Sequence, residues 1–189
     1  MATSARRERE RAQRHRLIIE TARTLAEREG WQAVTTRRLA EAIEYSQPVI
    51  YSHFANMDAV ADAVALGGIV ELAAQLRTAR EAGTDPRQSL DNIAAAYTAF
   101  AQTNPAVFDA IFTRPTTLLF ADEQSPQALV DAFGEIQAAV APMAAGRPIG
   151  TLTEVFWSLL HGLVTLNRDG RLHPSDVAQR LRLAVDLLG

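Results

Sequence analysis

Apolar residues recur every three to four positions along most of the chain, which is the spacing of one face of an α-helix. The first such stripe predicts a long helix over residues 9–29, whose apolar face carries Leu17, Ile18, Thr21, Ala22 and Leu25. Gly30 follows the stripe and suits the position just beyond a helix end.

Two short helices are predicted next, joined by a four-residue turn over residues 44–47. Thr35 is a good N-cap for the first, residues 36–43, because its hydroxyl can accept a hydrogen bond from a free backbone N–H group. Pro48 suits the first turn of the second, where no N–H is needed. Ile50 and Phe54 lie four positions apart and are expected to share its inner face.

The remaining pattern is also helical, and no run of residues resembles a strand. Asn56 is expected to cap a fourth helix, and residues 83–86 form the clearest break after it. The fourth to ninth helices are predicted over residues 57–82, 87–103, 105–112, 126–145, 149–168 and 174–188. Expected buried positions of the fourth are Val60, Ala63, Val64, Val70 and Leu76. We therefore predict an all-α fold of about nine helices, with an N-terminal arm and three-helix domain at 1–60 and a second helical domain at 61–189.

A long helix followed by two short helices and a tight turn is the helix-turn-helix pattern, whose last helix lies in the major groove of DNA. Gln47 can pair with adenine and Val49 can touch a thymine methyl group. Tyr51 and His53 can donate to phosphates, and the free N–H groups that begin the preceding helix favour phosphate too. The predicted DNA contacts are Thr35, Thr36, Arg37, Ser46, Gln47, Pro48, Val49, Tyr51, Ser52 and His53.

The charges support contact between the N-terminal region and a polyanion. The chain has a net charge of −3, yet residues 1–60 hold ten arginines and eight acids, while the remainder holds nine arginines and fourteen acids. Arg6, Arg7, Arg9, Arg11, Arg14 and Arg16 make up a basic arm. Two interpretations of this arm stay open: it contacts phosphates or a minor groove, or it is a solvated, disordered tail.

The sequence lacks the motifs that are typical of several classes of function. The chain has no cysteine, its four histidines lack metal-ligand spacing, and it has no glycine-rich phosphate loop or nucleophile elbow, so no enzyme, cofactor or metal site is expected. The N-terminus lacks an apolar signal segment, and the apolar stretch 149–166 is interrupted by polar residues, so a cytoplasmic protein is expected. A plain helical bundle, or a helical small-molecule-binding protein with little or no DNA binding, remains as an alternative.

The stretch from Val34 to Phe54, with Thr35-Thr36-Arg37, Gln47-Pro48 and Tyr51 in register, resembles the DNA-binding domain of the TetR (tetracycline repressor) family over residues 14–62. The resemblance implies a transcriptional regulator, by default a repressor, that binds a palindromic operator as a homodimer and is released by a small-molecule effector. Two positions depart from the family pattern. Glu44 stands where the turn usually has glycine, and Met57 stands where a lysine usually holds a phosphate.

The same resemblance implies that residues 61–189 form a ligand-binding and dimerisation domain. The last two helices carry apolar stripes that are expected to pair with their symmetry mates in a four-helix interface. An aromatic cavity is the expected form of the effector site, although aromatic residues at helical spacing also build ordinary cores. The candidate ligand contacts are Tyr97, Phe100, Phe108, Phe112, Phe133, Trp157 and His161.

Overall fold

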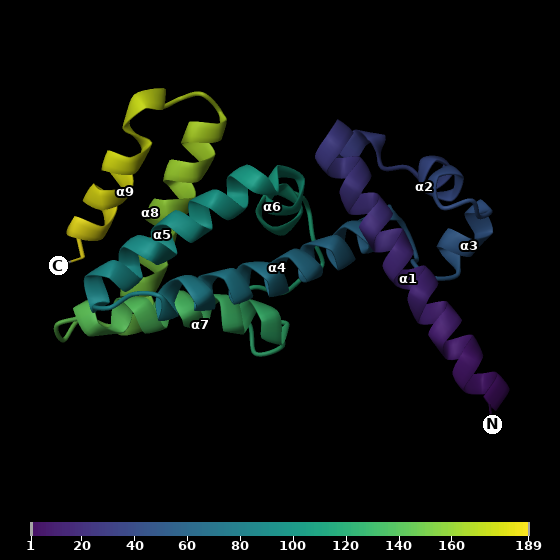
Figure 1. Cartoon of the computed structure of the whole chain (residues 1–189), viewed down its shortest axis with the longest axis horizontal. Coiled ribbons are helices and arrows are strands. Elements are labelled where there is room, and N and C mark those ends of the chain that lie inside the picture. The colour runs from purple at the N-terminus through teal and green to yellow at the C-terminus, as the bar shows by residue number, and fades with distance from the viewer. Residues whose placement is uncertain (1, 189) are drawn as a thin grey trace. The chain divides into compact units, whose positions relative to one another are not determined.

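The computed structural model describes residues 2–188, and in these residues every regular element is a helix. The predicted all-α class with about nine helices is therefore confirmed (Figure 1). The α-helices are α1 (Ala2–Glu29), α2 (Thr36–Ala42), α3 (Gln47–Tyr51), α4 (Met57–Glu81), α5 (Pro86–Thr103), α6 (Pro105–Phe112), α7 (Gln127–Val140), α8 (Ile149–Arg168) and α9 (Val177–Asp186). Short 3₁₀-helices are η1 (Trp31–Ala33), η2 (Ala141–Met143) and η3 (Pro174–Asp176).

Three helix ends differ from the sequence prediction. The first helix begins at Ala2 instead of residue 9, because the basic arm continues the helix and is stabilised by pairs such as Arg6–Glu10, four residues apart at 2.8 Å. The arm is thus not a disordered tail over residues 2–8. The seventh helix stops at Val140, where Pro142 lies in a 3₁₀ turn, and Pro174 likewise opens a 3₁₀ turn before α9.

The chain folds into two compact units. Unit 1 contains the residues up to Gly68 together with Asn104–Leu118, and unit 2 contains Ile69–Thr103 together with the residues from Leu119 onward. Unit 1 therefore includes α1–α3, the first half of α4 and all of α6. The division at residues 60 and 61 assigned functions to the two parts of the chain, and it stays a prediction.

The core of unit 1 gathers the apolar stripes of its short helices around α1. Its fully or almost fully buried side chains are Ile18, Ala22, Leu39, Ile50, Val60 and Val64. Leu17, expected on the same stripe, is 38% exposed and lies at its edge. Gly30 ends α1 with a φ of 81°, as expected of a glycine just beyond a helix end.

Helix α6 is held to α1 by polar contacts at its first turn. The Glu27 carboxylate accepts hydrogen bonds from the Ala106 and Val107 amides, both at 3.0 Å, and so satisfies N–H groups that have no partner within α6. The Trp31 indole donates to the Ala106 carbonyl at 2.8 Å. Gly68 of α4 allows close approach here, because a Cβ at that position would lie 2.1 Å from Val107 Cγ1.

Unit 2 packs α5 against α7, α8 and α9. Its largest buried side chains include Tyr97, Phe100 and Phe156, with Leu160 of α8 and Val185 of α9 also fully buried. Val70 of α4 was expected in the core but is 56% exposed, whereas its neighbour Ile69 is buried. The buried face of this part of α4 instead consists of Ile69, Leu72, Ala73 and Leu76.

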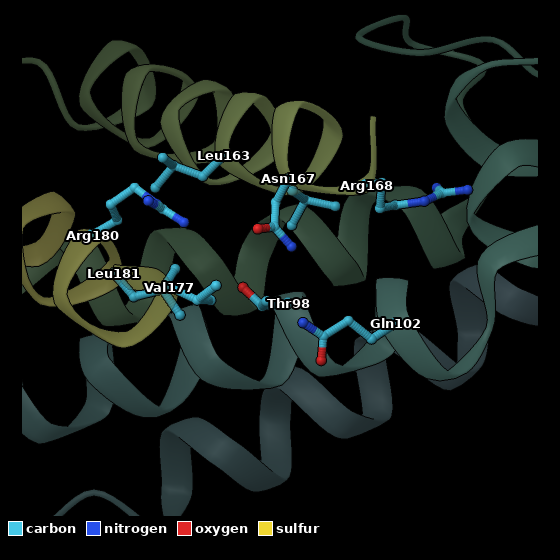
Figure 2. Close-up of a pocket in the computed structure, with 9 residues that line it drawn as sticks. Thr98, Gln102, Leu163, Asn167, Arg168, Val177, Arg180 and Leu181 are labelled. Atoms are coloured by element: carbon cyan, nitrogen blue, oxygen red, sulfur yellow. The ribbon is translucent and has the colours of Figure 1, made fainter. Parts of the chain in front are cut away.

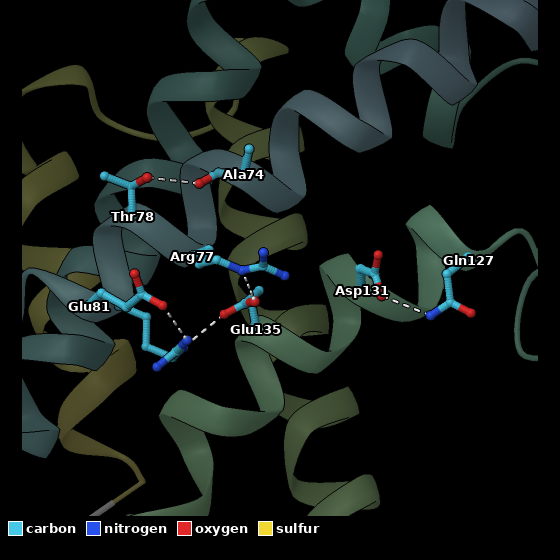
Figure 3. A network of polar contacts seen from close by, with 8 residues as sticks. Ala74, Arg77, Thr78, Glu81, Gln127, Asp131 and Glu135 are labelled. Carbon is cyan, nitrogen blue, oxygen red and sulfur yellow. Dashed lines mark hydrogen bonds and ion pairs between the residues drawn. The ribbon is translucent and has the colours of Figure 1, made fainter.

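A buried carboxylate ties α4 to α7 inside unit 2 (Figure 3). Glu135 of α7 accepts from Arg77 Nε at 2.7 Å and from Arg80 Nε at 2.8 Å. Burial alone raises the pKa of this carboxyl, but the two guanidinium hydrogen bonds more than reverse that effect and hold the pKa below its ordinary value. Glu135 is therefore a paired buried charge, which the low-dielectric interior tolerates.

Two helices, α4 and α8, are long and apolar enough to cross a membrane by length and composition alone. The expectation that residues 149–166 are too polar for this is therefore not met. Half of the relevant stretch of α4 is buried inside the described chain, but only 22% of that of α8 is. The large apolar side chains that α8 leaves exposed within the described chain are Val155 at 58% and Leu166 at 40%.

The turn between α2 and α3 keeps a left-handed residue although it lacks glycine. Glu44 has a φ of 58°, and the following amide of Tyr45 donates to the Ala40 carbonyl at 2.9 Å, which closes the end of α2. The absence of glycine has therefore not reshaped this turn.

We predict that Glu44→Gly raises the free energy of unfolding by about 1 kcal/mol, because a side chain is disfavoured at positive φ. Urea denaturation followed by circular dichroism measures this change. Glu41→Gly, at an exposed helical position of α2, is the control and should destabilise instead. A destabilising effect of Glu44→Gly would contradict the strain inferred for the turn.

Candidate functional site

Helices α2 and α3 form a helix-turn-helix whose inner side is apolar. The Thr35 hydroxyl caps α2 by accepting from the Arg38 amide at 3.3 Å. Helix α3 has Pro48 in its first turn, and Ile50 and Phe54 point into unit 1 with exposed fractions of 1% and 6%. The two inward-facing residues predicted from the spacing are therefore buried as expected.

The outer side of α3 carries most of the predicted DNA contacts. Ser46, Gln47, Pro48, Tyr51 and Ser52 are exposed, as the list of predicted contacts requires. Val49 and His53 are partly buried. The side chains of α3 therefore offer an amide, a phenol and a methyl-bearing group on one surface, which suits readout of base edges and phosphates.

The two helices are linked on this outer surface by their own side chains. The Tyr51 and Thr36 hydroxyls are 3.3 Å apart, and Thr36 also donates to Met57 Sδ at 3.4 Å. Asn56 caps α4 as predicted, accepting from the Ala59 amide at 2.8 Å. Met57, in place of a cation, therefore packs against α2 and offers no charge to a phosphate.

The arginines at the start of α2 have different roles. Arg38 forms a two-point ion pair with Glu29 at 2.7 and 3.0 Å, and this hydrogen bonding raises its pKa. Arg37 is highly exposed and has only a loose contact of 3.7 Å with Glu41. Arg37 is therefore the guanidinium of this pair that is available to a phosphate, in agreement with its place among the predicted contacts.

In unit 2, three of the predicted ligand residues form a chain of hydrogen bonds. The Trp157 indole donates to the Tyr97 hydroxyl at 3.1 Å, and that hydroxyl lies 3.0 Å from His161 Nδ1. Burial raises the pKa of Tyr97, so its hydroxyl stays protonated near neutral pH. Burial, with help from Arg168, lowers the pKa of His161, so the imidazole is neutral near neutral pH.

The other predicted ligand residues are distributed over both units. Phe133 of α7 packs edge-on against Trp157, with ring centroids 6.5 Å apart, and Phe100 is fully buried in the core of unit 2. Phe108 and Phe112 belong to α6 in unit 1, where their rings pack against each other at 4.8 Å. The structure thus brings together Tyr97, Phe133, Trp157 and His161.

A small cavity in unit 2 is lined by residues that the sequence did not single out (Figure 2). It lies among α5, α8 and α9 and combines apolar walls with amide and guanidinium groups. Its lining is Thr98, Gln102, Leu163, Val164, Asn167, Arg168, Val177, Arg180 and Leu181. Single side chains gave no signal for it, because the cavity arises from the packing of three helices far apart in sequence.

Two family models match the chain. Residues 18–64 match the model described as bacterial regulatory proteins, tetR family, and residues 90–188 match the model described as the tetracyclin repressor-like C-terminal domain. The first match contains the whole helix-turn-helix, and the second contains the aromatic cluster and the last two helices.

Similar proteins include Rv0681, an uncharacterized HTH-type transcriptional regulator of Mycobacterium tuberculosis, which is 26% identical over 84% of this chain and 72% of its own length. The crystal structure of the putative regulatory protein SCO4313 has a TM-score of 0.75 at 23% identity, covering 96% of this chain and 97% of the other. A TetR variant of Acinetobacter baumannii in complex with minocycline has a TM-score of 0.60 at 22% identity, covering 90% and 91%.

We predict that Tyr97→Phe lowers the free energy of unfolding by about 1–3 kcal/mol, because it leaves the Trp157 N–H and His161 Nδ1 without the hydroxyl that joins them. Chemical denaturation monitored by circular dichroism gives the value. Thr78→Val, which removes an exposed hydroxyl that donates to the Ala74 carbonyl of α4 at 3.0 Å, is the comparison and should have a smaller effect. Equal stability of Tyr97→Phe and the parent would show that the chain of hydrogen bonds contributes nothing.

Proposed function

The chain belongs to the TetR family of bacterial transcriptional regulators, and on this basis we propose that it is a repressor that binds a palindromic operator as a homodimer and leaves it when a small-molecule effector binds. Regulators of this family are DNA-binding transcriptional repressors. The observation that carries the proposal is the outer surface of α3, where Gln47, Pro48 and Tyr51 are exposed while Ile50 and Phe54 anchor the helix from behind. Such a protein acts in the cytoplasm, where the DNA lies.

Each side chain on this surface has a distinct proposed contact. Gln47 reads an adenine, and Val49 touches a thymine methyl group. Tyr51, Ser52 and His53 hold the DNA backbone from one end of α3. The proposed contact surface also includes Thr35, Thr36, Arg37, Ser46 and Pro48, the last at the start of α3. Because one recognition helix buries too little surface to specify a site, two copies are needed.

The proposed dimer contact uses α8 and α9. These helices lie side by side within unit 2 (Figure 1). They expose Val155 at 58% and Leu183 at 54%, and Leu187 just beyond α9 is exposed at 75%. Leu166 of α8 adds a further exposed apolar side chain at 40%. A second copy placed on these helices by a two-fold axis would cover both stripes in a four-helix interface.

The effector is proposed to bind within unit 2. The TetR variant of Acinetobacter baumannii, which shares this fold, holds minocycline. The proposed contacts are the cluster of Tyr97, Phe133, Trp157 and His161, together with Phe100. The cavity among α5, α8 and α9 is the second location that the packing favours.

Release is proposed to follow from a shift in population. The effector binds more tightly to a conformation whose two α3 helices no longer match successive major grooves. Helix α4 contributes residues to both compact units and is the proposed lever. By reciprocity, operator DNA must weaken effector binding by the same factor.

We predict that Gln47→Ala combined with Tyr51→Ala weakens binding of a selected genomic duplex by about 1–3 kcal/mol for the lost base contact alone, which corresponds to roughly 5-fold to 150-fold. Fragments selected from genomic DNA supply the duplex, and fluorescence anisotropy at fixed salt measures the affinity. The control is Gln124→Ala with Gln127→Ala, both exposed in unit 2 and outside α8 and α9. Unchanged affinity of the Gln47/Tyr51 variant would refute the proposed reading surface, and selection of no fragment at all would favour a binding protein without a DNA function.

We predict that Val155→Glu converts the dimer to monomer, because it buries a charge in an apolar interface. Sedimentation velocity measures the oligomeric state. Val130→Glu, on α7 and similarly exposed at 52%, is the matched control and should leave the dimer intact. A dimer that tolerates Val155→Glu but not Val130→Glu would place the contact on α7 instead.

A further inference from the structure

Two histidines and two arginines gather between α1 and the end of α3. The His15 ring of α1 stacks on the Phe54 ring at 4.5 Å with an interplanar angle of 15°, and its centroid lies 5.8 Å from that of His53. Arg11 and Arg14 of α1 are close enough to act on the charge of His53. We name these four residues, Arg11, Arg14, His15 and His53, the cationic cluster.

The cationic cluster is built without a carboxylate of its own. No acid is among the groups that shift the pKa of His53; burial lowers that pKa first, followed by the charges of His15, Arg11 and Arg14. The neighbouring acids have other partners: Glu10 of α1 pairs with Arg6 at 2.8 Å, and Asp58 at the start of α4 contacts Arg114 at 3.6 Å. Two arginine charges beside His53, with no acid among the groups that shift its pKa, favour an anion from outside the chain.

The position of the cluster indicates which anion. His53 follows the exposed Tyr51 and Ser52 at the end of α3, where the edge of a helix lying in the major groove meets the DNA backbone.

We propose that the cationic cluster is a binding site for one phosphodiester group of the operator, and that His53 takes up a proton when the site is occupied. The site deepens the proposed function and rests on it. It joins the basic arm of α1 to the recognition helix through a shared phosphate. It also makes the affinity for DNA depend on pH in the range where histidine titrates.

The direction of the pH dependence follows from the linkage of protons to binding. In the free protein the pKa of His53 lies below its ordinary value, so the ring is neutral near pH 7. A bound phosphate favours the charged imidazole and raises that pKa, so binding takes up protons. The affinity therefore increases as pH falls from about 8 to about 6, by up to about tenfold per pH unit for each proton taken up.

The test measures the affinity for a selected operator duplex by fluorescence anisotropy between about pH 6 and about pH 8 at fixed ionic strength. The chain as it stands should bind more tightly at low pH. The His53→Gln variant, and the combined variant that also carries His15→Gln, should lose this slope. His173→Gln is the matched control, because His173 is exposed in unit 2 and its loss should leave the slope unchanged. Circular dichroism verifies that each variant is folded.

A second measurement needs no variant. Calorimetric titration of the parent chain with the duplex, in buffers of different ionisation enthalpy, counts the protons taken up on binding, and the expected number is greater than zero at about pH 7. Tight binding without proton uptake, or a slope that survives in the combined variant, would overturn the cationic cluster and leave the regulator itself intact. Failure to bind any duplex at any pH would instead overturn the proposed function together with this site.

Discussion

The burial of Ile50 and Phe54 is the constraint on which the DNA-reading surface depends. Helix α3 spans only Gln47–Tyr51, and a helix of that length does not persist in water because nucleation costs more than a few backbone hydrogen bonds return. The two side chains fix α3 from behind, since Ile50 is 1% exposed and Phe54 6%. Phe54 has a second role, because its ring also stacks on the ring of His15 on α1. The orientation of Gln47 and the position of the cationic cluster are therefore set by the same buried ring.

The two units differ in how much of their apolar surface is buried within one chain. Unit 1 buries most of its apolar residues among short helices. The few large apolar side chains that are more than one third exposed include Leu17 at its edge and Tyr51 on the proposed DNA face. Unit 2 leaves Val155, Leu183 and Leu187 uncovered on α8 and α9, although its interior is well packed around Tyr97 and Phe100. Surface of this kind on a protein with a filled core is typical of an obligate partner contact.

The helix-turn-helix could be predicted residue by residue because its signals are local. Thr35 as a cap, Pro48 in a first turn, and Ile50 with Phe54 at a spacing of four each require only a few neighbouring residues to interpret. The membership of α6 in unit 1 could not be predicted, since it depends on Glu27 reaching amides some eighty residues away. Val70 was misplaced for a related reason: both Ile69 and Val70 are apolar, and only the packing of the other helices decides which one faces inward. The cavity among α5, α8 and α9 likewise exists only in the assembled unit.

The absence of lysine and cysteine gives the histidines an unusual share of the chain's chemistry near neutral pH. Arginine keeps its charge throughout, so the basic arm and Arg37 offer a constant attraction to phosphate. In unit 2, His161 Nδ1 lies 3.0 Å from the Tyr97 hydroxyl and the ring is held neutral by burial, while His173 lies exposed beside the Ser175 hydroxyl at 2.8 Å. In unit 1, His15 and His53 lie next to each other and to arginines, at the surface proposed to meet DNA. A change of pH near 7 therefore acts on the proposed DNA contact through His53, whereas the same change in unit 2 meets His161, which burial already holds neutral.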